Sequence, residues 1–170
     1  MKFLEKDLED IIFETDNDML EDRGLWIQGE KYRQVNMGGY GVADLITLRR
    51  PTYYPNHKKH DNPPHITIYE LKKDLIDESC FFQALRYCKA VKSFFDKQNK
   101  GFNEFNYGCP NYHLGFTLDI VLIGRDVKLS ESVCYLPDIF DNIQLYTYSY
   151  DVDGLSFKEQ IGYELINEGF

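Results

Sequence analysis

The sequence predicts an α/β fold in which a central mixed β-sheet is flanked by helices. Two observations lead to this prediction. Segments with apolar residues at helical spacing alternate along the chain with short runs that are rich in β-branched residues. In addition, no internal repeat or low-complexity linker divides the 170 residues, so we expect residues 1–170 to form a single domain.

The first half of the chain opens with an amphipathic helix. Within residues 3–14 apolar side chains recur at helical spacing, at Leu4, Leu8, Ile11 and Ile12. The elements that follow are predicted as a short helix or turn ending at Gly24, an extended stretch at 25–37, a turn at 38–41 and a strand at 42–49.

The second half begins with a proline-rich insertion. Residues 50–65 contain four prolines and three of the four histidines, and they are predicted to form a loop. The later elements are predicted as a strand at 66–72, a long amphipathic helix through about residue 97, a turn region at 99–111, strands at 114–123 and 144–150, and a hairpin turn at 153–154 leading to 155–158.

The charge balance limits the kinds of partner. The chain has 19 basic and 28 acidic residues, a formal net charge of −9. A protein that holds DNA by its phosphates usually presents a basic surface, so a nucleic-acid function requires a local basic patch here. No apolar run approaches the ~18 residues of a membrane span, and the N-terminus lacks the apolar stretch of a signal peptide. We therefore expect a soluble, cytoplasmic protein.

In each of two predicted strands, an ionised side chain lies on the same face as apolar side chains. Because strand residues alternate between faces, Asp44 shares its face with Ile46. By the same alternation, Glu70 and Lys72 share theirs with Ile68. A buried carboxylate is costly unless it is paired or bound to a cation, and two neighbouring carboxylates repel each other unless a metal ion neutralises both. Oxygen ligands of this kind favour Mg²⁺ or Mn²⁺ over zinc.

Such a set has a chemical use and a structural alternative. A divalent ion held by two carboxylates polarises a phosphodiester and lowers the pKa of a bound water, while Lys72 would orient that water or stabilise charge on phosphorus. Taken singly, however, Asp44 is typical of a strand residue at a sheet edge, and Glu70 with Lys72 is typical of a solvated pair at a strand end.

The same residues resemble the PD-(D/E)XK nuclease superfamily. The resemblance lies in Gly41-Val42-Ala43-Asp44 followed by Tyr69-Glu70-Leu71-Lys72. More narrowly, the chain resembles the RecB-like branch that includes archaeal mismatch- and flap-cutting endonucleases, through the E-x-x-L form that Glu5 opens and the Q-x-x-x-Y form of Gln83 and Tyr87. This resemblance covers roughly residues 3–95. It departs from the superfamily motif at Ala43, where the motif often has proline.

The resemblance implies a restriction-endonuclease-like fold and Mg²⁺- or Mn²⁺-dependent hydrolysis of DNA phosphodiester bonds. It implies that Asp44, Glu70 and the Leu71 carbonyl are metal ligands, that Lys72 is the catalytic lysine, that Glu5 helps to hold the metal or its water, and that Gln83 and Tyr87 support Lys72 or contact a phosphate. For Gln83 and Tyr87 the alternative is a half-buried polar pair that caps the core.

A function of another class stays open. The acidic surface also suits a catalytically inactive protein of nuclease fold that acts as a binding subunit or inhibitor. For the nuclease, target selection would come from this domain itself, from the partner in a homodimer or from another protein subunit. A basic rim around the pocket favours the nuclease, and the loop at 50–65 with Arg49, Arg50, Lys58 and Lys59 is a candidate for it. Acidic residues on all sides of the pocket favour the binding protein.

Overall fold

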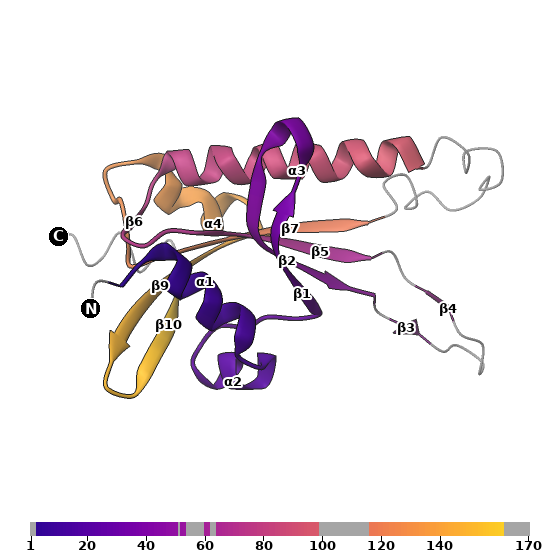
Figure 1. Cartoon of the computed structure of the whole chain (residues 1–170). Helices are drawn as coiled ribbons and strands as arrows, with labels where there is room; N and C mark the ends of the chain where they lie inside the picture. Colours follow the sequence, from indigo (N-terminus) through magenta and orange to yellow (C-terminus); the bar gives the residue numbers. More distant parts are fainter. Residues whose placement is uncertain (1–2, 51, 54–59, 62–63, 99–115, 162–170) are drawn as a thin grey trace.

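A six-stranded mixed sheet forms the centre of the molecule (Figure 1). The computed structural model describes residues 3–50, 52–53, 60–61, 64–98 and 116–161. The strands of the sheet, in spatial order, are β1 (Glu30–Asn36), β2 (Val42–Arg49), β5 (His65–Leu71), β7 (Thr117–Gly124), β9 (Ile143–Asp151) and β10 (Gly154–Gln160). The predicted α/β class and mixed central sheet are thereby confirmed.

The sheet combines antiparallel edges with a parallel centre. Strand β2 is antiparallel to β1 and β5, and β10 is antiparallel to β9, whereas β5–β7 and β7–β9 are parallel pairs. A parallel pair requires a long crossover connection, and the helix α3 (Glu78–Gln98) lies in the connection from β5 to β7. The register places Glu70 opposite Leu122 and Tyr69 opposite Leu45.

Helices cover both faces of the sheet. Helices α1 (Glu5–Glu14) and α2 (Asn17–Asp22) lie on one face, and α3 lies on the other together with the short helix α4 (Leu136–Ile139) (Figure 1). Leu8 and Ile12 of α1 are fully buried against a cluster that includes Tyr69. On the opposite face Tyr87 of α3 packs against Ile68. The alternation of β5 therefore directs Tyr69 and Glu70 to opposite sides of the sheet.

The start of α3 follows from its sequence. The backbone N–H of Cys80 donates to Asp77 Oδ1 at 3.2 Å, which satisfies one of the free amides of the first helical turn. A hydrogen bond from the Ser79 side chain is the largest of the influences that lower the pKa of Asp77. Asp77 thus caps the start of the helix, which runs to Gln98, close to the predicted end near residue 97.

Several short elements depart from the sequence prediction. The loop predicted at 50–65 contains a small hairpin of β3 (Thr52–Tyr53) and β4 (His60–Asp61). Strand β6 (Leu75–Ile76) pairs with β8 (Asp126–Val127), and 3-10 turns form at Gly38–Tyr40 and Ser132–Tyr135. The extended stretch at 25–37 forms a ladder only from Glu30, and the turn region at 99–111 lies outside the described residues. Among the helices that the structure describes, none is long and apolar enough to cross a membrane.

Candidate functional site

Glu70 is the most deeply buried ionisable group of the candidate site. Its side chain is 0% exposed, and Oε1 accepts a hydrogen bond from Lys72 Nζ at 2.6 Å. Within the part of the chain that the structure describes, the second oxygen, Oε2, is buried and has no hydrogen-bond partner. Burial raises the pKa of Glu70 to about 7, even though Lys72 acts to lower it. The pair is therefore not the solvated strand-end pair of the structural alternative.

Asp44 lies beside Glu70 where β2 and β5 separate. The ladder between these strands ends at Leu45 and Tyr69, and Asp44 Oδ2 accepts a hydrogen bond from the Leu71 backbone N–H at 3.0 Å. Burial raises the pKa of Asp44, and this outweighs the hydrogen bond from Leu71. A fully buried and a half-buried carboxylate thus lie at one end of the sheet. Asp44 is held by Leu71 of β5, and Glu70 is held by Lys72, which directly follows β5.

Lys72 directly follows the C-terminal end of β5 and is itself hydrogen-bonded to β7. Its backbone N–H donates to the Ile123 carbonyl at 2.7 Å, which continues the pairing with β7 by one residue. Burial acts to lower the pKa of the Lys72 side chain, but the hydrogen bond and charge of Glu70 outweigh it and the pKa is raised. The ammonium form is therefore favoured, and with the side chain 24% exposed its remaining protons can reach the solvent side of the site.

Helix α1, on the face of the sheet opposite to α3, contributes two further carboxylates. Glu5 Oε2 accepts a hydrogen bond from the Lys73 backbone N–H at 3.3 Å. Glu9 is 8% exposed and accepts one from Gln34 Nε2 at 2.6 Å. Glu5, Glu9 and Asp44 line one groove of about 660 Å³. Glu9 follows Glu5 at i+4 on the same helix face, and the resemblance favoured Glu5 over Glu9 because Glu5 opens the E-x-x-L form.

Gln83 and Tyr87 support the backbone that leads to Asp44. Gln83 Nε2 donates to Tyr87 Oη at 2.8 Å, and Tyr87 Oη donates to the Val42 carbonyl at 2.6 Å. The Tyr87 ring packs against Gly41, where an added Cβ would lie 3.4 Å from Cε1 and where φ is +110°. Tyr87 is 2% exposed, so this geometry corresponds to the polar pair that caps the core. Both bonds lead to the start of β2.

The charges around the groove are mainly acidic. Its lining comprises the acidic Glu5, Glu9, Asp10, Glu14 and Asp44 and the basic Lys6 and Arg33, together with Gln34. Arg33 is itself paired with Asp10 at 2.7 Å. The basic rim expected from the loop at 50–65 does not form from its described ends, because Arg49 and His65 lie at the opposite ends of β2 and β5. With five residues from Asp44 to Arg49, that is roughly 17 Å along the strand. Lys58 and Lys59 lie outside the described residues.

The donor atoms present suit a hard divalent cation. Oxygen donors from carboxylates and backbone carbonyls are the ligands that Mg²⁺ and Mn²⁺ prefer, and the unpartnered Oε2 of Glu70 is such an atom. Both the lack of a partner for Oε2 and the following absence hold for the described ranges: there, no group of three or more His, Cys, Asp or Glu side chains is arranged to hold a metal ion. A site built on Asp44 and Glu70 therefore requires a further oxygen donor, such as the Leu71 carbonyl.

The thiols of Cys80, which is buried, and Cys88, which is half-buried, are poor candidates for chemistry. Burial raises the pKa of Cys80 and of Cys88 to about 11, so both thiols stay protonated near neutral pH.

Comparisons with models of protein families, with curated proteins and with solved structures found no match to this chain.

Proposed function

We propose that this chain is a metal-dependent nuclease of restriction-endonuclease-like fold that hydrolyses DNA phosphodiester bonds with Mg²⁺ or Mn²⁺. The observation that carries the proposal is Oε2 of Glu70, which is buried and has no hydrogen-bond partner among the described residues, beside the half-buried carboxylate of Asp44. Leaving such an atom without a partner is unfavourable, and a bound cation would remove that cost.

Asp44, Glu70 and the Leu71 carbonyl would hold the metal ion. When bound, such an ion polarises a phosphoryl oxygen and lowers the pKa of a bound water. The protein contributes a fixed arrangement, because Asp44 is anchored to the Leu71 amide and Leu71 belongs to a strand paired on both sides. Gln83 and Tyr87 act as positioning residues, since their hydrogen bonds end at Val42, two positions before Asp44.

Lys72 would supply the positive charge at the reacting phosphate. The Nζ atom uses one proton on Glu70 Oε1 and retains others for an attacking water or a phosphoryl oxygen. Its raised pKa keeps it charged across the neutral range. Glu5, which reaches the Lys73 backbone from α1, lines the groove beside Asp44 and would hold a water there.

A second candidate function follows from the acidic groove. Five acidic and two basic side chains line it, which is more negative charge than one divalent ion neutralises. This favours a nuclease-fold binding protein whose partner presents a basic surface. In that case a basic polypeptide such as polylysine would bind the wild-type protein, and Glu14→Lys would weaken the binding.

The deciding experiment is cleavage of a panel of single-stranded, duplex, flapped and mismatched DNA with Mn²⁺ or Mg²⁺. Glu70→Gln and Lys72→Met keep the size of each side chain and remove the proposed chemistry. Each should lower the cleavage rate by on the order of 10²-fold or more. Two matched controls should cut like wild type: Lys73→Met alters the neighbouring lysine, and Glu131→Gln alters a carboxylate that is hydrogen-bonded to the Glu78 backbone.

The opposite result is equally well defined. If wild type cuts none of these DNAs with either ion, and calorimetry finds no Mn²⁺ binding that Glu70→Gln removes, the nuclease proposal fails. Binding of the basic polypeptide in the groove then becomes the function to pursue.

A further inference from the structure

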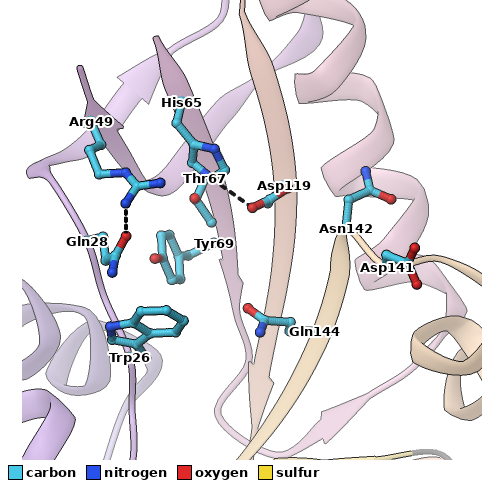
Figure 2. A pocket seen from close by; sticks show the side chains of 10 residues that line it. All are labelled: Trp26, Gln28, Arg49, His65, Thr67, Tyr69, Asp119, Asp141, Asn142 and Gln144. Carbon is cyan, nitrogen blue, oxygen red and sulfur yellow. Dashed lines mark hydrogen bonds and ion pairs between the residues drawn. The ribbon is translucent and has the colours of Figure 1, made fainter. Parts of the chain in front are cut away.

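A second pocket lies on the α1 side of the sheet, away from Glu70. His65, Thr67 and Tyr69 alternate along β5 and so share the face opposite to Glu70. With Arg49 from β2 and Asp119 from β7, they line a cavity of about 180 Å³ (Figure 2). Arg49 is at the end of β2 distant from Asp44, so this pocket is separate from the acidic groove.

Aromatic side chains form part of the pocket wall. Tyr69 is 2% exposed and belongs to the core, whereas Trp26 is 57% exposed. Figure 2 shows Trp26 and Gln144 toward one end of the pocket and Arg49 and His65 toward the other. An exposed indole at a pocket offers a flat apolar face for stacking, which is the way proteins commonly hold an unpaired base.

The polar groups of the pocket are separated by sign. The guanidinium of Arg49 donates to Gln28 Oε1, and its Nε is buried without a hydrogen-bond partner among the described residues. On the other side Asp119 Oδ2 lies 2.7 Å from His65 Nε2, and His65 Nδ1 lies 2.7 Å from Thr117 Oγ1. The imidazole is thus held between a carboxylate and a hydroxyl, and β5 lies between the cation and the anion.

This separation indicates the chemical class of the ligand. An anion such as a phosphate would meet the repulsion of Asp119 and Asp141, and a cation would meet that of Arg49. A neutral planar molecule with acceptors on one edge and donors on another satisfies both groups. Guanine has this pattern: O6 and N7 accept from arginine, whereas its ring N–H and exocyclic amine donate to carboxylates. The cavity is also smaller than the ~300 Å³ at which pockets for drug-sized ligands begin, which suits a single base.

We propose that this pocket binds one unpaired guanine base, stacked on Trp26 and held between Arg49 and Asp119. The base comes from a free nucleotide or from a single strand of nucleic acid, and the chemistry of recognition is the same for both. The proposal does not depend on cleavage at Glu70.

Trp26 is the only tryptophan of the chain, so its fluorescence reports directly on the pocket. Metal-free protein is titrated with the four nucleoside monophosphates and with short oligonucleotides that contain or lack guanine. Saturable quenching is expected with guanosine monophosphate and with the guanine-containing oligonucleotides. Equal affinity for the two identifies a free nucleotide as the source, and tighter binding of the oligonucleotide identifies a strand.

Two variants and a control make the test specific. Arg49→Met should weaken guanosine monophosphate binding about tenfold or more, and Asp119→Asn should remove the preference for guanine over adenine. Arg125→Met alters an exposed arginine at the other end of β7 and should bind like wild type. Circular dichroism checks that each variant is folded. The proposal is overturned if none of these ligands quenches the Trp26 fluorescence saturably. It is also overturned if the folded Arg49→Met variant is quenched in the same way as wild type.

Discussion

A carboxylate as deeply buried as Glu70 is stable in its charged form only if positive charge lies close to it. Lys72 provides one contact at 2.6 Å, but Oε2 has none among the described residues. In the metal-free protein the charged form is therefore disfavoured, and the pKa of Glu70 is raised by burial to about 7 from 4.5. The residue thus lowers the stability of the fold at neutral and alkaline pH.

The pH dependence of stability tests this statement at the level of one residue. Because the folded protein holds the Glu70 proton more tightly than the unfolded chain, the contribution is fully present below about pH 4.5 and is lost as the pH rises through about 7. Glu70→Gln is neutral at every pH. It should raise the free energy of unfolding of metal-free protein at pH 8 by on the order of 1–3 kcal/mol and have much less effect at pH 5.

Urea unfolding at a series of pH values measures this, and Glu131 provides a control of opposite sign. Hydrogen bonds from the Glu78 backbone and from Lys128 lower the pKa of Glu131, so its stabilising effect is present above the unfolded pKa and is lost as the pH falls. Glu131→Gln should accordingly lower the free energy of unfolding at neutral pH. The same pH profile in both variants would contradict the account of Glu70.

At the scale of elements, the close approach of α2 to β10 depends on one glycine. The Phe157 N–H donates to the Arg23 carbonyl at 2.8 Å, and Gly24 beside it has φ +90°. A Cβ on Gly24 would lie 2.2 Å from the Phe157 carbonyl oxygen. Gly24→Ala should lower the free energy of unfolding by about 2 kcal/mol or more, through backbone strain and this clash.

Gly39→Ala is the matched control for this change. An added Cβ at Gly39 meets nothing within 4 Å, so the variant should unfold within about 0.5 kcal/mol of wild type. Chemical denaturation of the two alanine variants and of wild type compares them directly. Equal stability of the two variants would show that α2 does not rest on β10 in this way.

Elements with a sustained periodic pattern were predictable, and elements made by distant pairing were not. Strands β2 and β5 and helix α3 have enough residues for alternation or helical spacing to emerge. Strands β6 and β8 have two residues each and exist because Leu75 meets Asp126 across the chain. No local pattern encodes such a contact. Helix α4 has only four residues, too few for helical spacing to emerge, although Pro137 lies in its first turn.

The candidate site was predictable in part for the same reason. Alternation alone assigned Asp44, Glu70 and Lys72 to strand faces, and the structure brings these side chains together. The contact of Glu9 with Gln34 was not predictable, because Gln34 has a φ of 50°, a left-handed conformation that its residue type does not indicate. The pocket at Trp26 was also missed, since its residues come from segments that only the sheet order brings together.

The net charge of −9 acts on the molecule as a whole. Mutual repulsion of excess acidic groups disfavours a compact state, and dissolved salt screens it. Potassium chloride should therefore raise the thermal unfolding midpoint of wild type and of Glu70→Gln by similar amounts. This part of the response is independent of the proposed metal site.

Magnesium chloride at matched ionic strength separates specific binding from screening. An ion that binds the folded protein adds about 2.7 kcal/mol of stability at a hundred times its dissociation constant. The additional rise in midpoint should occur in wild type and be absent in Glu70→Gln, as measured by differential scanning calorimetry. An equal magnesium effect in the two proteins would assign the whole response to screening.

The parallel pair at the centre of the sheet also has a consequence for how the chain folds. The outer pairs β1–β2 and β9–β10 join neighbouring segments, whereas β5 meets β7 through residues such as His65 and Thr117 that are 52 positions apart. Bringing the two ends of so long a stretch together costs conformational entropy before any stabilising contact between β5 and β7 forms. Topologies of this kind therefore fold slowly. Because Glu70 is on β5, the environment that holds its carboxylate forms only when β5 pairs with β7. A newly synthesised chain can therefore form its hairpins while it still lacks the site.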